Sequence, residues 1–186
     1  MSVPHYSHAC EQHKAQTMSY HSTIEGVITY STADDRNTVF ESLANGGWDT
    51  KKHSGDEPPT TISTITAIDH SENEYVIVIP RTDYQNLGKH IDMMVEDAID
   101  WRIIESTGDG ELYGYVYTPD ETQTHALTDW ISVHNESLAE REPEKDAYET
   151  HSDWFDAHTP WQLNVEYYFL NHMKDEINLT IDQYCK

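Results

Sequence analysis

The sequence has few basic residues, few cysteines and no long hydrophobic run. It contains 11 Lys and Arg against 34 Asp and Glu in 186 residues, so its formal charge is -23 at pH 7. Protonation of all 12 His would still leave -23 + 12 = -11. A charge of this size and sign repels DNA, RNA and anionic membranes. We therefore expect no general nucleic-acid binding and no membrane binding.

The lack of long apolar stretches indicates where the protein is located, and the positions of the two cysteines indicate whether they form a disulfide. No stretch approaches the ~18 apolar residues that a membrane span requires, and the first residues lack the apolar segment of a signal peptide. We expect a cytoplasmic protein or a virion component. Cys10 and Cys185 lie near opposite ends of the chain. Because a disulfide between them would require the two ends to meet, we expect free thiols.

The aromatic residues indicate that this acidic chain folds. It contains 5 Trp, 12 Tyr and 3 Phe, whereas acidic disordered chains have few large apolar side chains to bury. In molar salt the Debye length shortens to ~3 Å, so that closely spaced carboxylates repel one another weakly. The composition is typical of proteins from halophilic archaea or their viruses, although Lys outnumbers Arg here. An acidic mimic of DNA, acting as an inhibitor, is the alternative interpretation.

Hydrophobic periodicity and turn residues predict a mixture of strands and helices. The apolar run 75–79 is typical of a central strand covered on both faces. Residues 161–170 fit a helix that begins at Pro160, but their alternation also fits a strand. The predicted strands are 23–31, 60–69, 74–80, 101–106 and 111–118, and the predicted helices are 32–44, 82–100, 118–135 and 160–176.

The order of the first eight elements is strand, helix, strand, strand, helix, strand, strand, helix. This order resembles the ferredoxin-like split βαβ arrangement. The resemblance implies an α+β fold with an antiparallel sheet, an added hairpin strand and extra C-terminal helices. We divide the chain into a polar His-rich N-terminal arm at 1–22, a ferredoxin-like core at 23–135, an acidic connector at 136–158 and a C-terminal helix at 159–186 packed on the core.

The N-terminal arm carries a candidate metal site. His5, His8, Cys10 and His13 supply four potential ligands within nine residues. Imidazole and thiolate groups are preferred ligands of Zn²⁺ and Ni²⁺. The spacing matches no established zinc module, and His is abundant throughout the chain, so composition alone also accounts for the cluster. A metal-binding regulator that uses this arm is an alternative function.

A second group of possible ligands is His151, Asp153, Asp156 and His158. On a helix the two histidines share a face, but Asp153 does not. We interpret this stretch as solvated acids around buried aromatic side chains.

Enzymatic activity has no positive support in the sequence. There is no phosphate-binding loop, nucleophile elbow, metalloprotease motif or dinucleotide fingerprint. Carboxylates are so numerous that Glu105, Asp109 and Glu111 around a predicted turn cannot be singled out as acid–base catalysts. Enzymatic activity stays open, and a non-enzymatic role is favoured.

Three tyrosines mark a candidate interface. Strand alternation places Tyr113, Tyr115 and Tyr117 on one face of the predicted strand 111–118. In RNA-binding sheets such aromatic rows stack on bases, but no basic patch accompanies this one. We expect a helix or another subunit to cover it, because aromatic residues are enriched in interface cores. The expected function is a non-enzymatic interaction or structural protein of a halophilic archaeon or its virus, which forms a homo-oligomer or binds another protein.

Overall fold

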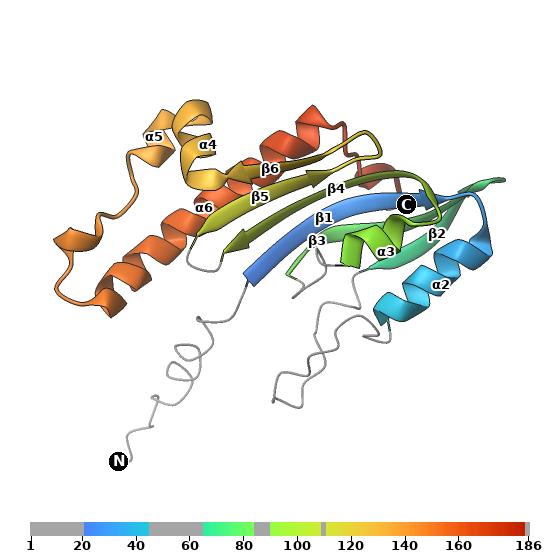
Figure 1. Ribbon diagram of the computed structural model, residues 1–186, viewed down its shortest axis with the longest axis horizontal. Helices are drawn as coiled ribbons and strands as arrows, with labels where there is room; N and C mark the ends of the chain where they lie inside the picture. Colours follow the sequence, from blue (N-terminus) through green and yellow to red (C-terminus); the bar gives the residue numbers. More distant parts are fainter. Residues whose placement is uncertain (1–20, 45–64, 84–89, 109–110, 185–186) are drawn as a thin grey trace, which may run out of the picture.

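The protein is an α+β structure with one antiparallel sheet and helices on both of its faces (Figure 1). The computed structural model describes residues 21–44, 65–83, 90–108 and 111–184. Within these residues the sheet has six strands in the order β2-β3-β1-β4-β5-β6, and each strand is antiparallel to its neighbours. The strands are β1 (His21–Tyr30), β2 (Thr66–Ser71), β3 (Glu74–Asp83), β4 (Ala98–Gly108), β5 (Leu112–Tyr117) and β6 (Thr122–Ala126).

The helices divide between the two faces of the sheet. Helices α2 and α3 pack on one face, here called the α2 face, while α4 and α6 pack on the other, the α6 face. The first turns of α6 extend past the end of the sheet (Figure 1). The described helices are α2 (Ala33–Ala44), α3 (Ile91–Val95), α4 (Leu127–His134), α5 (Glu136–Ala139) and α6 (His151–Glu176), with 3₁₀ turns at Lys145–Ala147 and Asp182–Tyr184.

Strand alternation gives each face its own core. In β1, Ile24 and Ile28 point to the α2 face, and Val27 points to the α6 face. On the α6 face a glycine permits close approach: a Cβ at Gly114 would lie 2.3 Å from Cζ of Phe169. Because α6 packs directly against β5 at this point, any larger residue would force the layers apart.

Several predicted elements are confirmed. The first strand, the hairpin of β2 and β3, and the hairpin of β4 and β5 all form. Helix α2 begins as predicted: Oγ1 of Thr32 accepts a hydrogen bond from the backbone N–H of Asp35 (3.2 Å) and donates to its carboxylate (2.5 Å). Thr32 therefore caps the helix as its sequence pattern indicates.

The predicted helix at 118–135 is wrong in its first part. The backbone N–H of Thr118 donates to the carbonyl of Glu121 (3.0 Å), and Oγ1 of Thr118 accepts from the N–H of Glu121 (3.3 Å). These bonds close a turn, and the chain continues into β6 before α4 begins at Leu127. The Thr-Pro-Asp-Glu pattern that begins at Thr118 is compatible with a turn as well as with a helix start. The turn forms here because β6 pairs with β5.

The predicted helix at 82–100 is also wrong in extent. Strand β3 continues to Asp83, helix α3 spans five residues and β4 begins at Ala98. Ala98 pairs with Tyr30 of β1, so cross-strand bonding overrides the helical pattern at this end. The hydroxyl of Tyr30 donates to the carbonyl of Met94 (2.5 Å) and ties the short helix to the central strand.

The C-terminal segment is a helix, which decides between the two patterns at 161–170. It begins at His151 rather than at Pro160, so part of the predicted connector is helical. Indole N–H groups on both sides of Pro160 anchor it: Trp154 donates to the carbonyl of Pro143 (2.9 Å), and Trp161 donates to that of Leu138 (2.8 Å). These tertiary contacts offset the hydrogen bond that a helix loses at a proline.

A buried ionic cluster fixes α6 to the sheet. Glu25 of β1 has a side chain that is 5% exposed. It accepts hydrogen bonds from Nη2 of Arg81 in β3 (3.1 Å) and from Nζ of Lys174 in α6. Nη2 of Arg81 also donates to Oδ1 of Asn171 in α6 (2.9 Å), and its guanidinium lies 4.8 Å from the ring centroid of Tyr167. One carboxylate thus joins two strands and a helix that begins more than a hundred residues later.

We expect Glu25→Gln to destabilise the protein far more than Lys174→Met. Removal of one partner from a buried ion pair costs about 3–5 kcal/mol, and the partial exposure of both cations here favours the lower end. The second variant leaves Arg81 paired with Glu25, so its cost should be about 1 kcal/mol. Urea unfolding at a fixed KCl concentration measures both. Losses below about 1 kcal/mol in both variants would show that the cluster does not anchor α6.

Candidate functional site

The candidate site is the α2-side surface of β5 and β6, here called the tyrosine face. In β5, Leu112, Gly114 and Val116 are buried toward the α6 face. The alternate residues of the strand, Tyr113, Tyr115 and Tyr117, are half-buried on the opposite face. The strand therefore separates a packed layer from an aromatic row, as its alternating sequence predicts.

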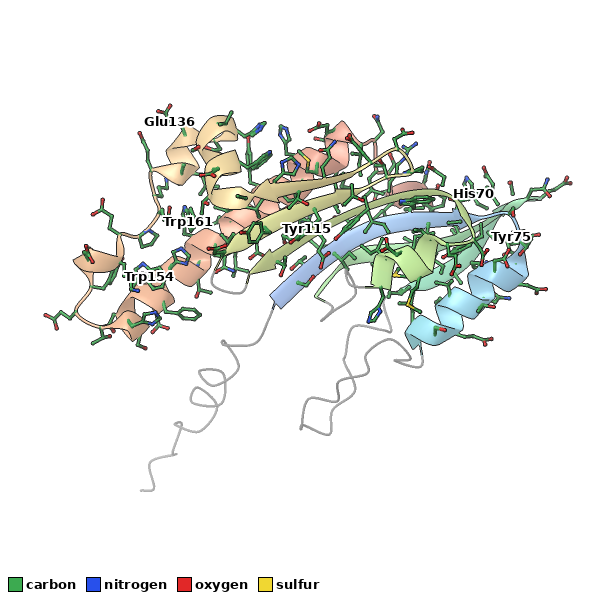
Figure 2. All side chains as sticks on the ribbon, viewed as in Figure 1. His70, Tyr75, Tyr115, Glu136, Trp154 and Trp161 are labelled. Atoms are coloured by element: carbon green, nitrogen blue, oxygen red, sulfur yellow. The ribbon has the colours of Figure 1, made fainter. Side chains whose placement is uncertain are left out.

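The tyrosine rings form a regular row. The ring centroids of Tyr113 and Tyr115 lie 6.5 Å apart, and those of Tyr115 and Tyr117 lie 6.1 Å apart with an interplanar angle of 18°. Tyr115, labelled in Figure 2, lies on β5, next to the edge strand β6. Tyr117, at one end of the row, also packs against the core beneath α2 and α3. Through Tyr117, the apolar core on this face extends from β4 to the neighbouring strand β5.

Strand β6 completes the face at the edge of the sheet. Its residues alternate between exposed and half-buried: Thr122, Thr124 and Ala126 are exposed, while Gln123 and His125 turn toward the α6 face. Among the described helices, α2 packs on β1, β2 and β3, and α3 packs on β4. Within the described part of the chain, the main contacts of α2 and α3 with the sheet are with β1 to β4 rather than with β5 and β6. The expectation that a helix or another subunit covers the tyrosines stays a prediction.

A buried carboxyl group lies beside the row. Glu105 of β4 is 4% exposed and accepts hydrogen bonds from the hydroxyls of Ser22 and Tyr117, the latter at 3.0 Å. Burial raises the pKa of Glu105 above its ordinary value, and the two hydrogen bonds partly oppose that shift. The sequence places Glu105 near a turn but gives no sign that it is buried.

An exposed carboxylate lies at the other end of the row. The hydroxyl of Tyr113 donates to Oε2 of Glu111 (2.6 Å), and this bond raises the pKa of Tyr113. Neither β5 nor β6 contains a Lys or Arg residue. The face is therefore aromatic and acidic.

A second buried carboxylate lies under α6. Glu166 is 3% exposed and accepts hydrogen bonds from Oγ of Ser106 (3.3 Å) and Nε2 of Gln162 (3.0 Å). Because these bonds join the helix to β4, we interpret Glu166 as structural.

The polar cavity near the C-terminal turn is small. It lies between β1, β4 and the turn at Asn178, whose φ is 52°, and its volume is about 180 Å³. Arg102 closes part of it by donating to the carbonyls of Ile177 (3.3 Å) and Asn178 (3.1 Å). Small-molecule sites typically measure ~300–1,000 Å³, so this cavity is a poor candidate.

The proposed metal ligands His5, His8, Cys10 and His13 lie outside the described residues, as does Cys185. Among the residues that are described, no three His, Cys, Asp or Glu side chains are arranged to hold a metal ion.

The second histidine group forms an aromatic ladder on α6. Trp154 lies between His151 and His158, at centroid distances of 5.4 Å and 4.6 Å, and His158 lies 4.9 Å from Trp161. Asp153 instead lies in the first turn of the helix, where its N–H donates to Oγ1 of the capping residue Thr150 (3.1 Å). Both tryptophans, labelled in Figure 2, lie in the first half of α6. The ring contacts indicate packing rather than ligation.

A further aromatic cluster, which sequence reasoning missed, joins α4 to α6. Trp130 stacks on His134 at 4.2 Å, His134 lies 5.0 Å from His172, and the hydroxyl of Tyr168 donates to the carbonyl of His134 (3.1 Å). The four-residue spacing within each pair, 130 with 134 and 168 with 172, was the available signal. Nearby, burial lowers the pKa of His125, which packs 5.7 Å from Phe169.

Comparison of the chain with protein-family models, curated proteins and solved structures gives no match. None of the helices in the described ranges is both long and apolar enough to cross a membrane.

The buried state of Glu105 gives a pH-dependent prediction. Because its pKa is raised on folding, the folded protein holds this proton more tightly, and stability is lost as the pH rises through the folded pKa. Glu105→Gln cannot ionise, so its melting temperature should exceed that of the wild type at pH 8, and the advantage should vanish toward about pH 4. The exposed control Glu144→Gln should show no such trend. A variant that is less stable than the wild type at every pH would contradict this account of Glu105.

Proposed function

We propose that this chain is a non-enzymatic interaction or structural protein of a halophilic archaeon or its virus. Its partner, a second copy or another protein, docks on the tyrosine face. The observation that carries the proposal is the row of three half-buried tyrosines along one face of β5. Aromatic residues supply large contact areas with few rotatable bonds and dominate many protein interfaces.

The charge of the face favours protein over nucleic acid. Base-stacking sheets combine aromatic rings with basic residues that neutralise phosphates. Here β5 and β6 lack Lys and Arg, Glu111 lies at one end of the row, and the whole chain carries a charge of -23. A polyanion would meet repulsion both locally and at long range.

A ferredoxin-like architecture remains part of the proposal. The strand order β2-β3-β1-β4, with α2 between β1 and β2 and α3 between β3 and β4, supports it. Strands β5 and β6 then extend the sheet beyond β4, and the tyrosine face lies on this extension.

Adaptation to salt predicts how stability responds to KCl. Folding brings the excess carboxylates closer together, and added salt screens their repulsion while strengthening apolar burial. We expect the melting temperature to rise continuously from ~0.1 M to beyond 1 M KCl. Lowering the pH toward about 5 should partly imitate the salt by protonating His and some carboxylates. A melting temperature that stays flat across this range would remove the halophile interpretation and favour the acidic DNA mimic.

The interaction role is tested by capture at 2 M KCl. Tagged wild type and tagged Tyr115→Ser are each mixed with an untagged copy and with extract from the native host, and the retained proteins are identified by mass spectrometry. We expect the wild type to retain a stoichiometric protein, either the untagged copy or another chain, and Tyr115→Ser to lose it. Tyr148→Ser, outside the sheet, is the matched control and should retain it. Equal retention by both variants would exclude the tyrosine face as the docking surface.

A further inference from the structure

We infer that the outer edge of β6 pairs with β6 of a second copy of the chain, so that two sheets join into one across a two-fold axis at Thr124. This inference goes beyond the proposed function, because it concerns an edge of the sheet rather than the tyrosine face. Two features carry it: β6 lacks the devices that protect the other edge of the sheet, and its sequence is complementary to itself.

Strand β6 is the last strand of the described sheet (Figure 1). It pairs with β5 in an unbroken register from Thr122 to Ala126, and among the described strands none pairs with its other side. An edge strand presents a row of backbone N–H and C=O groups to a further strand. Thr122, Thr124 and Ala126 are exposed along β6. The strand therefore offers backbone donors and acceptors over its whole length.

The opposite edge of the sheet, β2, is protected. Its pairing with β3 shifts register between Asp69 and Ser71, which breaks the regular edge. Nη1 of the buried Arg36 in α2 donates to the carbonyl of Ile68 (2.8 Å) and to Oδ1 of Asp69 (2.7 Å). Bulges, charged side chains and covering groups are the devices by which natural sheets prevent pairing at their edges. This end of the sheet is therefore closed to a second copy.

Strand β6 carries none of these sequence devices. Its residues, Thr122–Ala126, include no Asp, Glu, Lys, Arg or Pro, and its pairing with β5 has no bulge. Helix α4, which follows the strand, packs through Leu127, Trp130 and Ile131 into the core of the α6 face. The two edges of one sheet thus differ in the features that decide whether an edge can pair.

The sequence of β6 suits antiparallel pairing with itself. Two-fold pairing brings the same surface of both copies together. With the axis at Thr124, that residue lies opposite its own counterpart, Gln123 lies opposite His125 and Thr122 lies opposite Ala126. Cross-strand Thr–Thr pairs stabilise a sheet, and glutamine and histidine can form hydrogen bonds with each other. Each residue of the strand therefore meets a compatible, uncharged neighbour.

The distribution of charge allows a second copy at this edge. Each copy carries a charge of -23, but the nearest acidic residues, Glu121 and Asp129, lie outside the strand at opposite ends. The register therefore sets Glu121 of one copy beside the uncharged Leu127 of the other. Added salt screens the remaining long-range repulsion. Pairing through β6 should strengthen as KCl rises, whereas binding of a basic protein would weaken.

The first test measures the oligomeric state of the full-length chain by sedimentation equilibrium. Samples of about 1–200 µM chain are compared at about 0.5 M and 2 M KCl, with circular dichroism confirming the fold. We expect a monomer–dimer equilibrium whose dissociation constant falls at the higher salt. Thr124→Lys should raise that constant about tenfold or more, because two ammonium groups would meet at the axis. Thr66→Lys, at an exposed position of β2, is the matched control and should leave it unchanged.

Cysteine cross-linking then tests the register, in a background that carries Cys10→Ser and Cys185→Ser. Opposite Cα atoms of an antiparallel pair lie ~4.5–5.5 Å apart, within the span of a disulfide, so Thr124→Cys should form covalent dimers on mild oxidation. Thr122→Cys should not, because the register separates the two copies of this residue by four positions, or ~13 Å along the strands. Thr66→Cys on β2 should also stay monomeric. If Thr124→Lys does not fold, this measurement decides.

Three results would overturn the inference. These are a chain that stays monomeric over the whole concentration range, a dimer that Thr124→Lys leaves intact, and cross-linking of Thr124→Cys no faster than that of Thr122→Cys. Open-ended assemblies that Thr66→Lys weakens would indicate pairing of β6 with β2 of the next copy, and they too would reject two-fold pairing through β6.

The tests also separate this inference from the proposed function. Tyr115→Ser should keep the dimer, because the side chain of Tyr115 lies on a face of the sheet rather than at its edge. If two copies pair through β6, the partner that Tyr115→Ser loses in the capture experiment is a different protein. A dimer that is lost in Tyr115→Ser and kept in Thr124→Lys would support docking on the tyrosine face and reject pairing through β6.

Discussion

The attachment of α6 to the sheet depends on the carboxylate of Glu25. It lies in the central strand and meets Arg81 from β3 and Lys174 from α6, so that three segments distant in sequence share one buried charge. Burial of an unpaired carboxylate would be costly, and the two cations make it tolerable. Once α6 is held here, its apolar side chains complete the core on this face, and Glu166 adds a second polar tie through Ser106. The position of α6 also fixes α4, through the aromatic cluster around Trp130.

The helices cover different strands on the two faces of the sheet, and the candidate site lies where this covering differs. On the α6 face, α4 and α6 cover the strands out to β5 and β6, with Gly114 leaving room for Phe169. On the α2 face, the main contacts of α2 and α3 are with β1 to β4. Strand β5 has apolar residues on one side and tyrosines on the other, and β6 adds threonines at the edge. Tyrosine suits such a surface because its ring packs while its hydroxyl stays hydrogen-bonded, as Tyr113 and Tyr117 show.

The large negative charge connects stability with recognition. We expect a charge of this size to make the stability of the folded state depend on ionic strength and to disfavour polyanionic partners. Of the few basic residues, Arg81, Arg102 and Lys174 serve structural contacts within the protein. Strands β5 and β6 of the tyrosine face contain no Lys or Arg, and this supports the proposed preference for a protein over a nucleic-acid partner.

The sequence by itself determined the mixed α+β character, the β2–β3 and β4–β5 hairpins, the cap of α2 and the tyrosine row, because each follows from a local period or from a hydrogen bond between near neighbours. Tertiary structure decided the rest. The capping signature at Thr118 became a turn because β6 pairs with β5, and the helix expected across 82–100 shortened because Ala98 pairs with Tyr30. The buried states of Glu25 and Glu105 and the ring contacts between α4 and α6 join residues far apart in the chain. No local sequence pattern predicts these contacts, because they form only when the helices pack on the sheet.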